Sequence, residues 1–450
     1  MSSRSHATTA QQNFVREFRA SSPYIHAHRQ RTFVIFFGGE ALLDTRLDTS
    51  ATSLIHDFAL LHSLGIKLVL VHGIRPQIDA SLARRGLRSK FHDDLRITDR
   101  EALQAVKEAA GTVKVTIEAL LSLGITHSPM ANARVRVVSG NFVMARPIGV
   151  INGIDYGYTG AVRRIDHEGI AQQLAQHNVV LVSPIGYSPS GEVFNLVAEQ
   201  LATDVAIALR AHKLILLTEQ PCLAPDSGQL IPQLTAHEAE VLLLRYNESL
   251  APLRHSLQAA VRACQNGVER VHLVDRTQEG SLLLELFTRD GLGTLISQNP
   301  YEIQRPARLD DIAGILELIT PLQQQGVLKA RSREKLEMDI DDYWVIERDG
   351  LIIGCAALHS FPEQRVGEIA CLAVHHDYRK GARGSELLRA LLKRAKDCGV
   401  SKIYALSTQT MQWFIERGFT PVAIDELPEC ILRHYQPARN SKALCYQWDD

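Results

Sequence analysis

Between Arg31 and about Ser297, apolar runs alternate with segments of helical periodicity. The apolar runs are typical of buried strands and lie at Thr32–Phe37, Lys67–His72, Val135–Ser139, Val179–Ser183, Lys213–Thr218 and Arg270–Val274. The helical segments between several of them are Ala51–Leu64, Arg100–Leu123, Ala198–Ala211 and Leu253–Asn266. Strands that are apolar on both faces and alternate with helices indicate a parallel sheet covered by helices. The pattern predicts a doubly wound α/β domain over residues 31–290.

A second domain follows a segment of linker composition. Gly, Ser, Gln, Asn and Pro occur together in Gly291–Pro300, which is typical of a connecting loop, and we expect the linker at residues 291–302. In the second domain, residues 303–450, we expect helices at Ile312–Leu322 and from about Arg331, and strands at Tyr343–Glu347, Leu351–Leu358 and Lys402–Leu406. Ahead of the first strand, Phe14, Val15 and Phe18 predict an amphipathic helix within an N-terminal arm, residues 1–30.

Composition argues against several classes of partner. Apolar residues make up 45% and charged residues 22% of the chain, as in globular proteins with a buried core. The formal net charge of -1 gives no reason to expect binding to nucleic acid or to an anionic membrane. No apolar run approaches the roughly 20 residues that a membrane helix needs, and the first ten residues lack the apolar core of a secretion signal. Seven scattered cysteines without a Cys-x-x-Cys pair favour reduced thiols in the cytoplasm and no metal site.

The strand–turn–helix stretch that begins at Gly367 carries the clearest chemical signal. Residues 367–374 are expected to form a half-buried strand and residues 375–384 a basic turn that contains glycine, and a helix should begin near Gly384. A helix N-terminus exposes unpaired backbone N–H groups and the positive end of the helix dipole, so the turn is suited to seat a pyrophosphate. The same pattern also fits an ordinary strand-to-helix turn, because short glycine-containing turns are weak signals alone.

The turn resembles motif A of the GNAT acetyltransferases, Arg/Gln-x-x-Gly-x-Gly/Ala. Arg379 takes the first position and Gly384 the second glycine, whereas Ala382 replaces the first glycine and puts a Cβ where phosphate approaches the backbone. The sequence is also similar to that of the bacterial N-acetylglutamate synthases at residues 367–374, 405–408, 413–419 and 425–428. The resemblance implies a GNAT α+β domain that transfers acetyl from acetyl-CoA to the α-amine of L-glutamate, the first step of arginine biosynthesis.

The resemblance assigns residues to each part of this reaction. Acetyl-CoA is expected on the strand backbone and the basic turn, at Cys371, Leu372, Ala373, Val374, Arg379, Lys380, Gly381, Ala382, Arg383 and Gly384. Glu368 is the expected general base, although a glutamate on a solvated strand edge is common. Ser407 is expected to stabilise the departing thiolate by a hydrogen bond, although a serine beside Thr408 also fits a helix cap.

Glutamate carries two carboxylates, so its pocket should contain arginine. By resemblance the pocket is lined by Arg331, Cys371, Leu406, Arg439 and Ser441, whereas Ile431 stands near the place where relatives have a further arginine. Glu368 and Cys371 are three residues apart and would point to opposite faces of a regular strand. If both line the pocket, the strand must contain a β-bulge between them, as in GNAT domains.

The first domain resembles the amino acid kinase fold, specifically N-acetylglutamate kinase, at residues 183–186, 214–218 and 283–288. The groups that handle phosphate are missing at the matching positions. Phe36 replaces a lysine, Gly73-Ile74-Arg75 replaces a triglycine loop, and Glu199 and Val197 replace an aspartate and an asparagine. Phosphoryl transfer depends on positioned cations and backbone donors, so we expect a kinase fold without kinase activity.

The resemblance instead implies that the first domain binds L-arginine as a feedback inhibitor. Arginine-regulated relatives carry a pattern that is matched here by Tyr24, Lys213, His272, Glu285 and Gly291. A carboxylate can pair a guanidinium bidentately. From the residues alone, His272 also fits a strand interior and Glu285 a solvated helix face. Ala20 replaces a histidine of some relatives, and the N-terminal helix is expected to join subunits into a homo-oligomer, with a hexamer favoured.

Two competing interpretations stay open at this point. One is an acetylglutamate kinase with an accessory domain, which would form ADP from ATP. The other is a non-catalytic arginine sensor whose acetyltransferase half is degenerate, as the replacements at Ala382 and Ile431 indicate.

Overall fold

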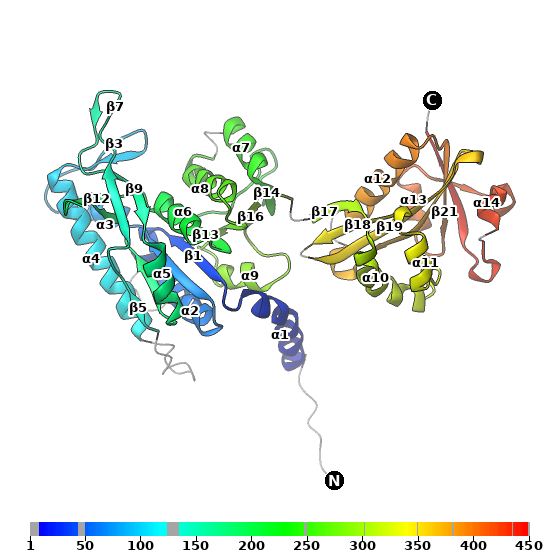
Figure 1. Cartoon of the computed structure of the whole chain (residues 1–450), viewed down its shortest axis with the longest axis horizontal. Coiled ribbons are helices and arrows are strands. Elements are labelled where there is room, and N and C mark those ends of the chain that lie inside the picture. Colours follow the sequence, from blue (N-terminus) through cyan, green and yellow to red (C-terminus); the bar gives the residue numbers. More distant parts are fainter. Residues whose placement is uncertain are drawn as a thin grey trace, which may run out of the picture. The chain divides into compact units, whose positions relative to one another are not determined.

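The computed structural model describes residues 9–43, 50–123, 135–246, 250–300, 302–348, 350–379, 382–433 and 435–448. The chain divides into two compact units between Asn299 and Pro300, and Figure 1 labels their elements. No helix within the described part of the chain is both long enough and apolar enough to cross a membrane.

The first unit is built on an eight-stranded sheet with the order β14-β16-β15-β13-β1-β2-β10-β5. Its strands are β1 (Thr32–Phe37), β2 (Lys67–His72), β5 (Val137–Val138), β10 (Val179–Val182), β13 (Lys213–Thr218), β14 (Gln233–Thr235), β15 (Arg270–Asp275) and β16 (Thr294–Ser297). All neighbouring pairs are parallel except β15 with β16. The six strands expected in the first domain are therefore confirmed, with β5 shorter than predicted.

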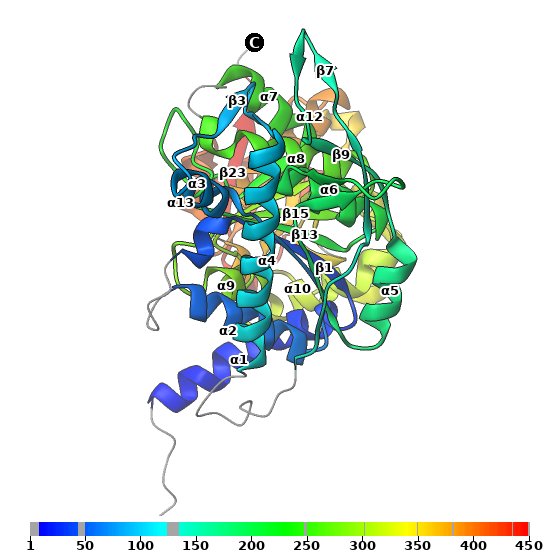
Figure 2. The same cartoon turned by 90° about the vertical axis from the view of Figure 1, so that its left-hand side faces the viewer.

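Successive residues of the central strands point into two separate cores, one on each face of the sheet. Phe33, Ile35 and Phe37 pack with α2 (Ser50–Ser63), α3 (Arg75–Ala83), α4 (Arg100–Ser122) and α9 (Ser281–Phe287). Val34 and Phe36 pack with α5 (His167–Ala175), α6 (Ala198–Ala208), α7 (Ala236–Arg245) and α8 (Arg254–Gln265). Figures 1 and 2 show these helices on both sides of the strands. The two-sided apolar pattern of the sequence thus becomes a three-layer α/β/α unit.

Shorter strands form a second sheet that the sequence did not indicate. The order is β12-β11-β6-β9, with β6 (Val143–Pro147), β9 (Gly160–Ile165), β11 (Ile185–Tyr187) and β12 (Val193–Asn195). The two-stranded ribbons are β3 (Lys90–His92) with β4 (Leu95–Ile97), and β7 (Val150–Ile151) with β8 (Ile154–Asp155). The expected linker is also partly structured, because residues 294–297 form β16. The buried Thr294, Ile296 and Ser297 hold that strand against β15.

The predicted N-terminal helix is confirmed as α1 (Thr9–His28). Its last turn is fixed to the first unit, since His28 Nε2 lies 2.8 Å from the carbonyl oxygen of Leu286 on α9. Its first turns are not covered, with Phe14 68% and Phe18 58% exposed. The two phenyl rings stack with their centroids 6.0 Å apart.

The second unit contains a seven-stranded sheet with the order β17-β18-β19-β20-β21-β23-β22. The strands are β17 (Glu302–Pro306), β18 (Tyr343–Arg348), β19 (Leu351–Phe361), β20 (Val366–Val374), β21 (Lys402–Ser407), β22 (Thr420–Val422) and β23 (Lys442–Gln447). Helices α10 (Ile312–Gln324) and α11 (Arg333–Met338) share one core with the sheet, and α12 (Arg383–Asp397) and α13 (Met411–Ile415) share the core on the other face. The remaining short helix is α14 (Glu429–Leu432).

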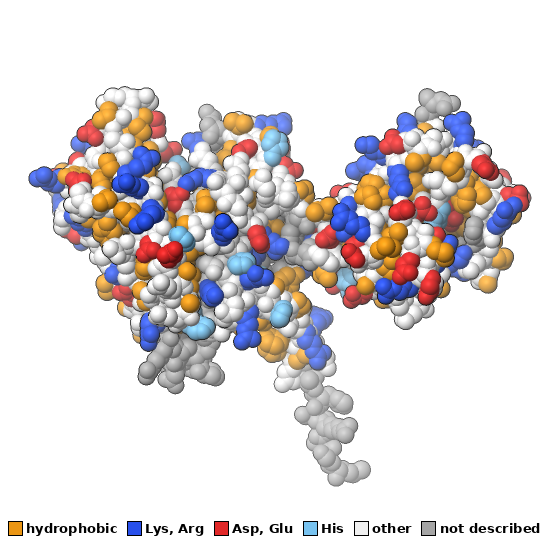
Figure 3. Space-filling view, in the orientation of Figure 1, with side chains coloured by type: hydrophobic (Ala, Val, Ile, Leu, Met, Phe, Trp, Pro, Cys, Tyr) orange, Lys and Arg blue, Asp and Glu red, His pale blue; other side chains and the backbone are white. Residues whose placement is uncertain are grey.

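Neighbouring strands of this sheet are antiparallel, except β20 and β21, which run parallel. A parallel pair needs a crossover connection, and α12 supplies it. On the face drawn in Figure 3, basic and acidic side chains are interspersed over both units, in keeping with the small formal net charge of -1.

Candidate active site

A β-bulge in β20 brings Glu368 and Cys371 to the same side of the sheet. Opposite β19, the pairing passes from Ala357↔Ala370 to Cys355↔Ala373, so β20 holds one extra residue there. Cys371 adopts a left-handed backbone conformation with φ 53°, which breaks the alternation of side chains. Ala370 and Cys371 both pack toward the core beneath α10 and α11. The bulge expected from the spacing of Glu368 and Cys371 is therefore present.

One cavity of about 330 Å³ collects the residues expected to bind the amino acid substrate. Its lining includes Glu368, Arg331, Cys371, Leu406, Arg439 and Ser441. These residues come from β20, from the end of β21, from the segment before α11, and from the region around η9 (Pro437–Arg439). Segments more than a hundred residues apart in the sequence thus meet at one site, as Arg331 and Arg439 do.

The two arginines present positive charge to this cavity. Arg331 Nη1 donates to the carbonyl of Lys329 at 3.0 Å, and Arg439 Nη2 donates to the carbonyl of Val327 at 2.9 Å. Burial lowers the pKa of Arg439, and the nearby positive charge of Arg331 lowers it further. Both side chains stay protonated because a guanidinium does not lose its proton in proteins. A ligand with carboxylates would relieve the repulsion between them.

The Cys371 thiol is held among polar groups rather than in an inert apolar contact. A hydrogen bond with the Cys355 thiol lowers the pKa of Cys371, and the charge of Arg331 acts in the same direction, while burial opposes both. Cys355 Sγ also lies 3.5 Å from the carbonyl oxygen of Cys371. The bulge residue is therefore fixed by contacts on both its backbone and its side chain.

Ser407 lies at the end of β21, next to the cavity-lining Leu406, but it is not itself among the cavity-lining residues. Its hydroxyl accepts a hydrogen bond from the backbone N–H of Thr410 at 2.9 Å and lies 2.8 Å from the Thr410 hydroxyl. Ser407 is 7% exposed. The hydroxyl therefore closes a turn ahead of α13, whose N-cap residue is Thr410, and this contact fixes its position at the strand end.

Beyond the bulge, β20 separates from β21. The parallel pairing ends at Ile369↔Ala405, whereas β19 continues beside β20 to Gly354↔Val374. The N–H of His375 donates to Ile353 of β19, so the backbone polar groups of Val374 point to the opposite side. Arg379 Nε reaches the Val374 carbonyl there at 3.4 Å. The backbone polar groups of Val374 therefore point away from β19, on the side from which β21 has separated.

The basic turn ends at the N-terminus of α12. Ala382 is the N-cap residue, with φ −82° and ψ 11°, and no side chain caps this end among the described residues. The alanine causes no backbone strain, because its φ is negative. Gly384 allows close packing, since a Cβ there would lie 3.3 Å from the Trp413 ring. Lys380 and Gly381 lie outside the described residues.

The Arg383 side chain is engaged within the protein. Its guanidinium forms a bidentate ion pair with Glu302, with contacts of 2.8 and 2.6 Å, and its Nη1 donates to the Tyr378 carbonyl at 3.1 Å. This network joins the turn to β17 on which Glu302 lies. The Arg383 guanidinium is thus engaged by Glu302 and Tyr378, and an anion at this helix N-terminus would meet backbone N–H groups.

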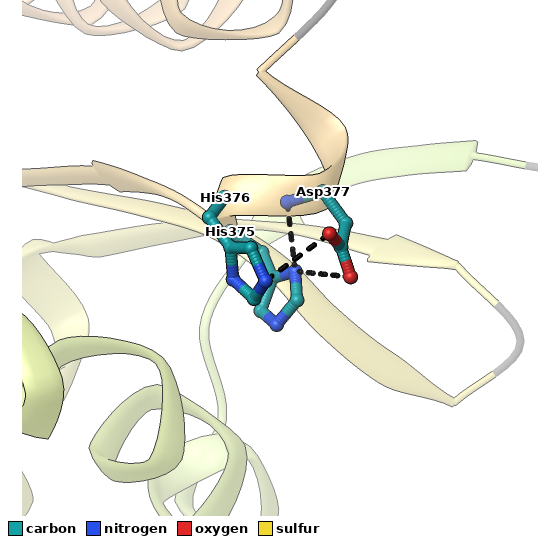
Figure 4. Close-up of side chains that lie close together, drawn as sticks. All are labelled: His375, His376 and Asp377. Atoms are coloured by element: carbon teal, nitrogen blue, oxygen red, sulfur yellow. Dashed lines mark hydrogen bonds and ion pairs between the residues drawn. The ribbon is translucent and has the colours of Figure 1, made fainter. Parts of the chain in front are cut away.

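Three consecutive residues at the start of the turn, His375, His376 and Asp377, lie close enough together to hold a metal ion. Figure 4 shows both imidazoles beside the carboxylate. His376 Nε2 lies 3.1 Å and His375 Nδ1 3.9 Å from carboxylate oxygens of Asp377. The His376 and Asp377 side chains are 72% and 49% exposed, which is typical of a solvated turn. That no metal takes part in the reaction stays a prediction.

Sequence reasoning missed further polar residues of the cavity, above all His359 and Asp342. His359 Nδ1 lies 2.7 Å from Asp342 Oδ2. The signal that could have found His359 is strand pairing, since β19 and β20 form a hairpin in which His359 stands directly opposite Glu368. Asp342 gives no such signal, because it reaches the site from η5 (Ile340–Asp342) through tertiary packing.

The first unit keeps a smaller cavity, of about 170 Å³, where the kinase resemblance places phosphate chemistry. The replaced positions line it together: Phe36, Gly73, Ile74, Arg75, Val197 and Glu199. Phe36 belongs to the hydrophobic core. The Arg75 guanidinium lies over the Phe91 ring, 5.1 Å from its centroid. The Phe36 ring thus stands where phosphoryl transfer would need a lysine. Arg75, whose guanidinium lies over the Phe91 ring, stands in place of a glycine of the phosphate loop.

The residues expected to bind arginine form one connected polar network in the first unit. Lys213 Nζ lies 2.9 Å from His272 Nε2, and His272 Nδ1 lies 2.5 Å from Glu285 Oε1. An ammonium only donates, so Nε2 accepts and the Nδ1–H donates to Glu285. Burial and the charge of Lys213 lower the pKa of His272 to about 4, which keeps the imidazole neutral.

Gly291 borders the same network, and Tyr24 lies on α1. The N–H groups of Leu292 and Gly293 donate to Glu285 Oε2 at 2.8 and 2.7 Å. Gly291 has φ 63°, and a Cβ there would lie 2.3 Å from Glu285 Oε2, so only glycine fits. Tyr24 lies one helical turn before His28 on α1, and His28 contacts the helix α9 that carries Glu285.

Comparison with known proteins agrees with this two-part architecture. Residues 31–275 match the amino acid kinase family, and residues 312–419 match the acetyltransferase (GNAT) family. The amino-acid acetyltransferase of Azotobacter vinelandii is 49% identical over 96% of this chain and 99% of its own length. That of Pseudomonas aeruginosa is 47% identical, with the same coverage of both chains.

Solved structures give the same result. N-acetylglutamate synthase from Neisseria gonorrhoeae, complexed with coenzyme A and L-arginine, is 39% identical, covers 97% of this chain and 100% of its own, and superposes with a TM-score of 0.84. The same enzyme with coenzyme A and N-acetyl-glutamate superposes with a TM-score of 0.62. The fold class and the enzyme class expected from the sequence are both confirmed. The chain belongs to the N-acetylglutamate synthase family of amino-acid acetyltransferases, with an amino acid kinase-like domain followed by a GNAT domain.

Proposed function

We propose that this enzyme transfers acetyl from acetyl-CoA to the α-amine of L-glutamate, giving N-acetyl-L-glutamate and CoA, as the entry step of arginine synthesis. The observation that carries the proposal is the charge pattern of the 330 Å³ cavity, in which Arg331 and Arg439 stand with Glu368. Two guanidinium groups and one carboxylate complement the two carboxylates and one ammonium of glutamate. The relative from Neisseria gonorrhoeae is bound to coenzyme A and N-acetyl-glutamate, the two products of this reaction, which supports the proposal.

We assign the catalytic steps to groups in and beside the cavity. Glu368 lies on the cavity wall and takes the proton of the glutamate ammonium, which frees the nitrogen lone pair for attack on the thioester. The backbone N–H groups on the open edge of residues 371–374 stabilise the oxyanion and pair with the pantetheine arm. Ser407, fixed by Thr410 at the end of β21, donates a hydrogen bond to the departing thiolate. A thiol pKa of about 8.5 makes that thiolate a weak base that needs little proton transfer.

The turn before α12 holds the pyrophosphate of acetyl-CoA in this proposal. The uncapped N-terminus of the helix presents backbone N–H groups and the positive end of the dipole. Arg379 lies beside the open edge of β20 through its contact with Val374, where its charge adds to the attraction.

Arginine is proposed to inhibit through the first unit. The Lys213–His272–Glu285 network supplies a buried carboxylate, and Gly291 lets the chain pass close to it. The arginine bound to the relative from Neisseria gonorrhoeae supports a regulatory site in this family. The kinase-like cavity is proposed to be inactive, because Phe36 and Arg75 occupy it.

The exposed phenyl stack of Phe14 and Phe18 supports a homo-oligomer in which α1 packs on another subunit, with a hexamer favoured. Light scattering of the purified protein tests this, and a monomer would rule it out. The seven cysteines, which are all free, support a reducing location such as the cytoplasm.

The decisive experiment is an assay of purified protein with acetyl-CoA and glutamate, following release of free thiol with and without arginine. We expect thiol release that depends on glutamate and that arginine suppresses, with aspartate as the control acceptor. ADP formation from ATP and acetylglutamate would favour the kinase interpretation. Arginine binding without thiol release from any amino acid would favour the sensor.

A further inference from the structure

Asp342 and His359 form a hydrogen-bonded carboxylate–imidazole pair on the wall of the acetyltransferase cavity. His359 Nδ1 lies 2.7 Å from Asp342 Oδ2, and both residues line the 330 Å³ cavity. A carboxylate only accepts hydrogen bonds, so the Nδ1 atom carries the proton and Nε2 keeps its lone pair. In many enzymes a histidine that acts as a general base is oriented in the same way, by a carboxylate that accepts a hydrogen bond from its Nδ1–H group.

Strand register places His359 beside Glu368. The two residues are direct partners across β19 and β20, on the stretch of regular pairing that precedes the bulge. Direct partners on an antiparallel pair point to the same face with Cβ atoms about 4.5–5.5 Å apart. The positive charge of a protonated His359 also lowers the pKa of Cys371, which places its imidazole near the bulge.

Charged groups of both signs line the same cavity as His359 and come from several elements. Asp342 comes from η5, Lys335 and Asp339 from α11 and the residue after it, Glu368 and Cys371 from β20, and Arg331 and Arg439 from the segments described above. Lys335 Nζ and Asp339 Oδ1 pair with each other at 3.0 Å. Asp342 is the carboxylate that contacts the imidazole directly, with its Oδ2 2.7 Å from His359 Nδ1.

Deprotonation of an amino acid by a carboxylate alone is uphill. A carboxyl group has a pKa of about 4 and an α-amino group a pKa of about 8, whereas an imidazole has a pKa of about 6.5. An imidazole next to the carboxylate reduces that gap, because it accepts the proton at a pH close to neutral.

We infer that His359, oriented by Asp342, accepts the substrate proton from Glu368 and passes it to solvent. In this step the N–H bond of the ammonium breaks, the proton moves to a Glu368 oxygen, and His359 Nε2 then takes it and restores the carboxylate. His359 acts through Glu368 and is a positioning residue for the proton rather than a ligand of the substrate. The inference rests on the proposed acetylation of glutamate.

The test compares full-length His359→Gln and Asp342→Asn with wild type, and with Asp341→Asn as a matched control. Asp341 is the exposed neighbour of Asp342 and does not line the cavity. We expect His359→Gln to lower kcat by about 100-fold, with little change in KM for acetyl-CoA, and to remove the near-neutral ionisation from the acidic limb of the kcat/KM profile. Asp342→Asn should also lower kcat and change the pH profile, because the imidazole loses the carboxylate that orients it.

Chemical rescue separates proton transfer from a structural role. Added imidazole should restore activity to His359→Ala by about tenfold or more, whereas a merely structural pair would not respond. If His359→Gln fails to fold, as judged by tryptophan fluorescence, the Asp342→Asn profile decides the question. An active wild type together with unchanged pH profiles in both variants would overturn the role of His359 and leave the proposed function standing. Absence of glutamate-dependent thiol release by the wild type would overturn both.

Discussion

At the scale of single residues, the acetyltransferase cavity presents guanidinium groups whose charge is available to a ligand. The hydrogen bonds described for Arg331 and Arg439 go to backbone carbonyls and not to carboxylates. The one carboxylate expected to act on the substrate, Glu368, lies on a strand and not on a loop. Rigid elements hold a reacting group more firmly than loops do. The charge of the site is thus arranged before any ligand arrives.

Replacing Glu368 with Gln removes the proposed base while keeping the size of the side chain. We expect kcat to fall by about 100-fold or more, because the amide cannot accept the ammonium proton. The KM for acetyl-CoA should stay within about threefold. Steady-state thiol release measures both, with Glu363→Gln as the control, since Glu363 is exposed in η6 (Pro362–Gln364). A Glu368→Gln enzyme with wild-type kcat would assign the base to another group.

Replacing Glu285 with Gln tests the arginine network of the first unit. Burial raises the pKa of the Glu285 carboxyl, but hydrogen bonding by His272 and the N–H groups of Leu292 and Gly293 outweighs burial, so the pKa is lowered and the group is ionised at neutral pH. Loss of this charge should weaken arginine binding by about 10- to 100-fold, the effect of losing a charge-assisted hydrogen bond. Calorimetric titration with arginine measures it, with the exposed Glu269→Gln as control. Unchanged affinity would place the arginine site elsewhere.

At the scale of elements, the bulge in β20 decides what the sheet can do. It turns Cys371 into the cavity, and β20 separates from β21 just beyond Ile369. A regular strand would have kept its backbone groups paired on both sides. The helix α12 begins at Arg383, nine residues after β20 ends at Val374, and the proposed binding of acetyl-CoA uses both the strand edge and the helix N-terminus.

The bulge predicts an unusual order of stability at position 371. Cys371 has φ 53°, which valine tolerates poorly and glycine readily. We expect Cys371→Val to be less stable than Cys371→Gly by about 1–3 kcal/mol. All three tryptophans, Trp344, Trp413 and Trp448, lie in the second unit, so denaturation followed by tryptophan fluorescence reports on it directly. Equal stability would mean that the bulge relaxes when the residue changes.

The motif departure at Ala382 can be tested by restoring glycine. Ala382 occupies the N-cap position of α12 with an unstrained φ of −82°, so the alanine does not distort the turn. Because glycine is preferred over alanine at an N-cap, Ala382→Gly should stabilise the second unit by roughly 0.5–1 kcal/mol. The same change should lower the KM for acetyl-CoA by only about two- to threefold. A much larger gain would mean that the alanine Cβ blocks the phosphate.

At the scale of the whole molecule, the two units differ in how they hold histidine. His28, His72 and His272 are all buried in the first unit. Removal of water from each imidazole lowers the pKa of all three to about 4. In the second unit, the side chains of His359, His375 and His376 are 22%, 38% and 72% exposed. We therefore expect that lowering the pH destabilises the first unit before it destabilises the second.

The sign of this effect follows from proton binding. Between about pH 6.5 and 4 these histidines become protonated in the unfolded chain but stay neutral in the folded first unit. The free energy of unfolding of the first unit therefore falls as the pH falls. At pH 5.5 each buried histidine should cost about 1 kcal/mol relative to pH 7.5. Hydrogen exchange of the β1, β2 and β13 amides at the two pH values measures the loss. His72→Gln should reduce the slope, whereas the exposed His237→Gln should not. If the exchange rates, after correction for the intrinsic pH dependence of amide exchange, were equal at the two pH values, the predicted loss of stability would be contradicted.

Much of the fold could be predicted because buried residues recur at the regular spacing of a strand or a helix, which can be read from a short stretch of sequence. The two-sided apolar runs that became β1, β2 and β13 needed no knowledge of their partners. The short strands of the second sheet, such as β11 and β12, carry too few residues for a period to emerge. The strand β16 lies in a segment of linker-like composition, and only its pairing with β14 and β15 makes it a strand.

For the site, the sequence by itself determined the residue types and the resemblance that assigns them: Glu368 and Cys371 on one strand, a turn before a helix, and arginines far along the chain. The spacing of Glu368 and Cys371 even required a bulge, because side chains three apart alternate on a regular strand. Only the tertiary structure decided that Arg331, Arg439 and Asp342 reach the same cavity. Contacts between segments so distant depend on sheet register and packing, which no local period encodes.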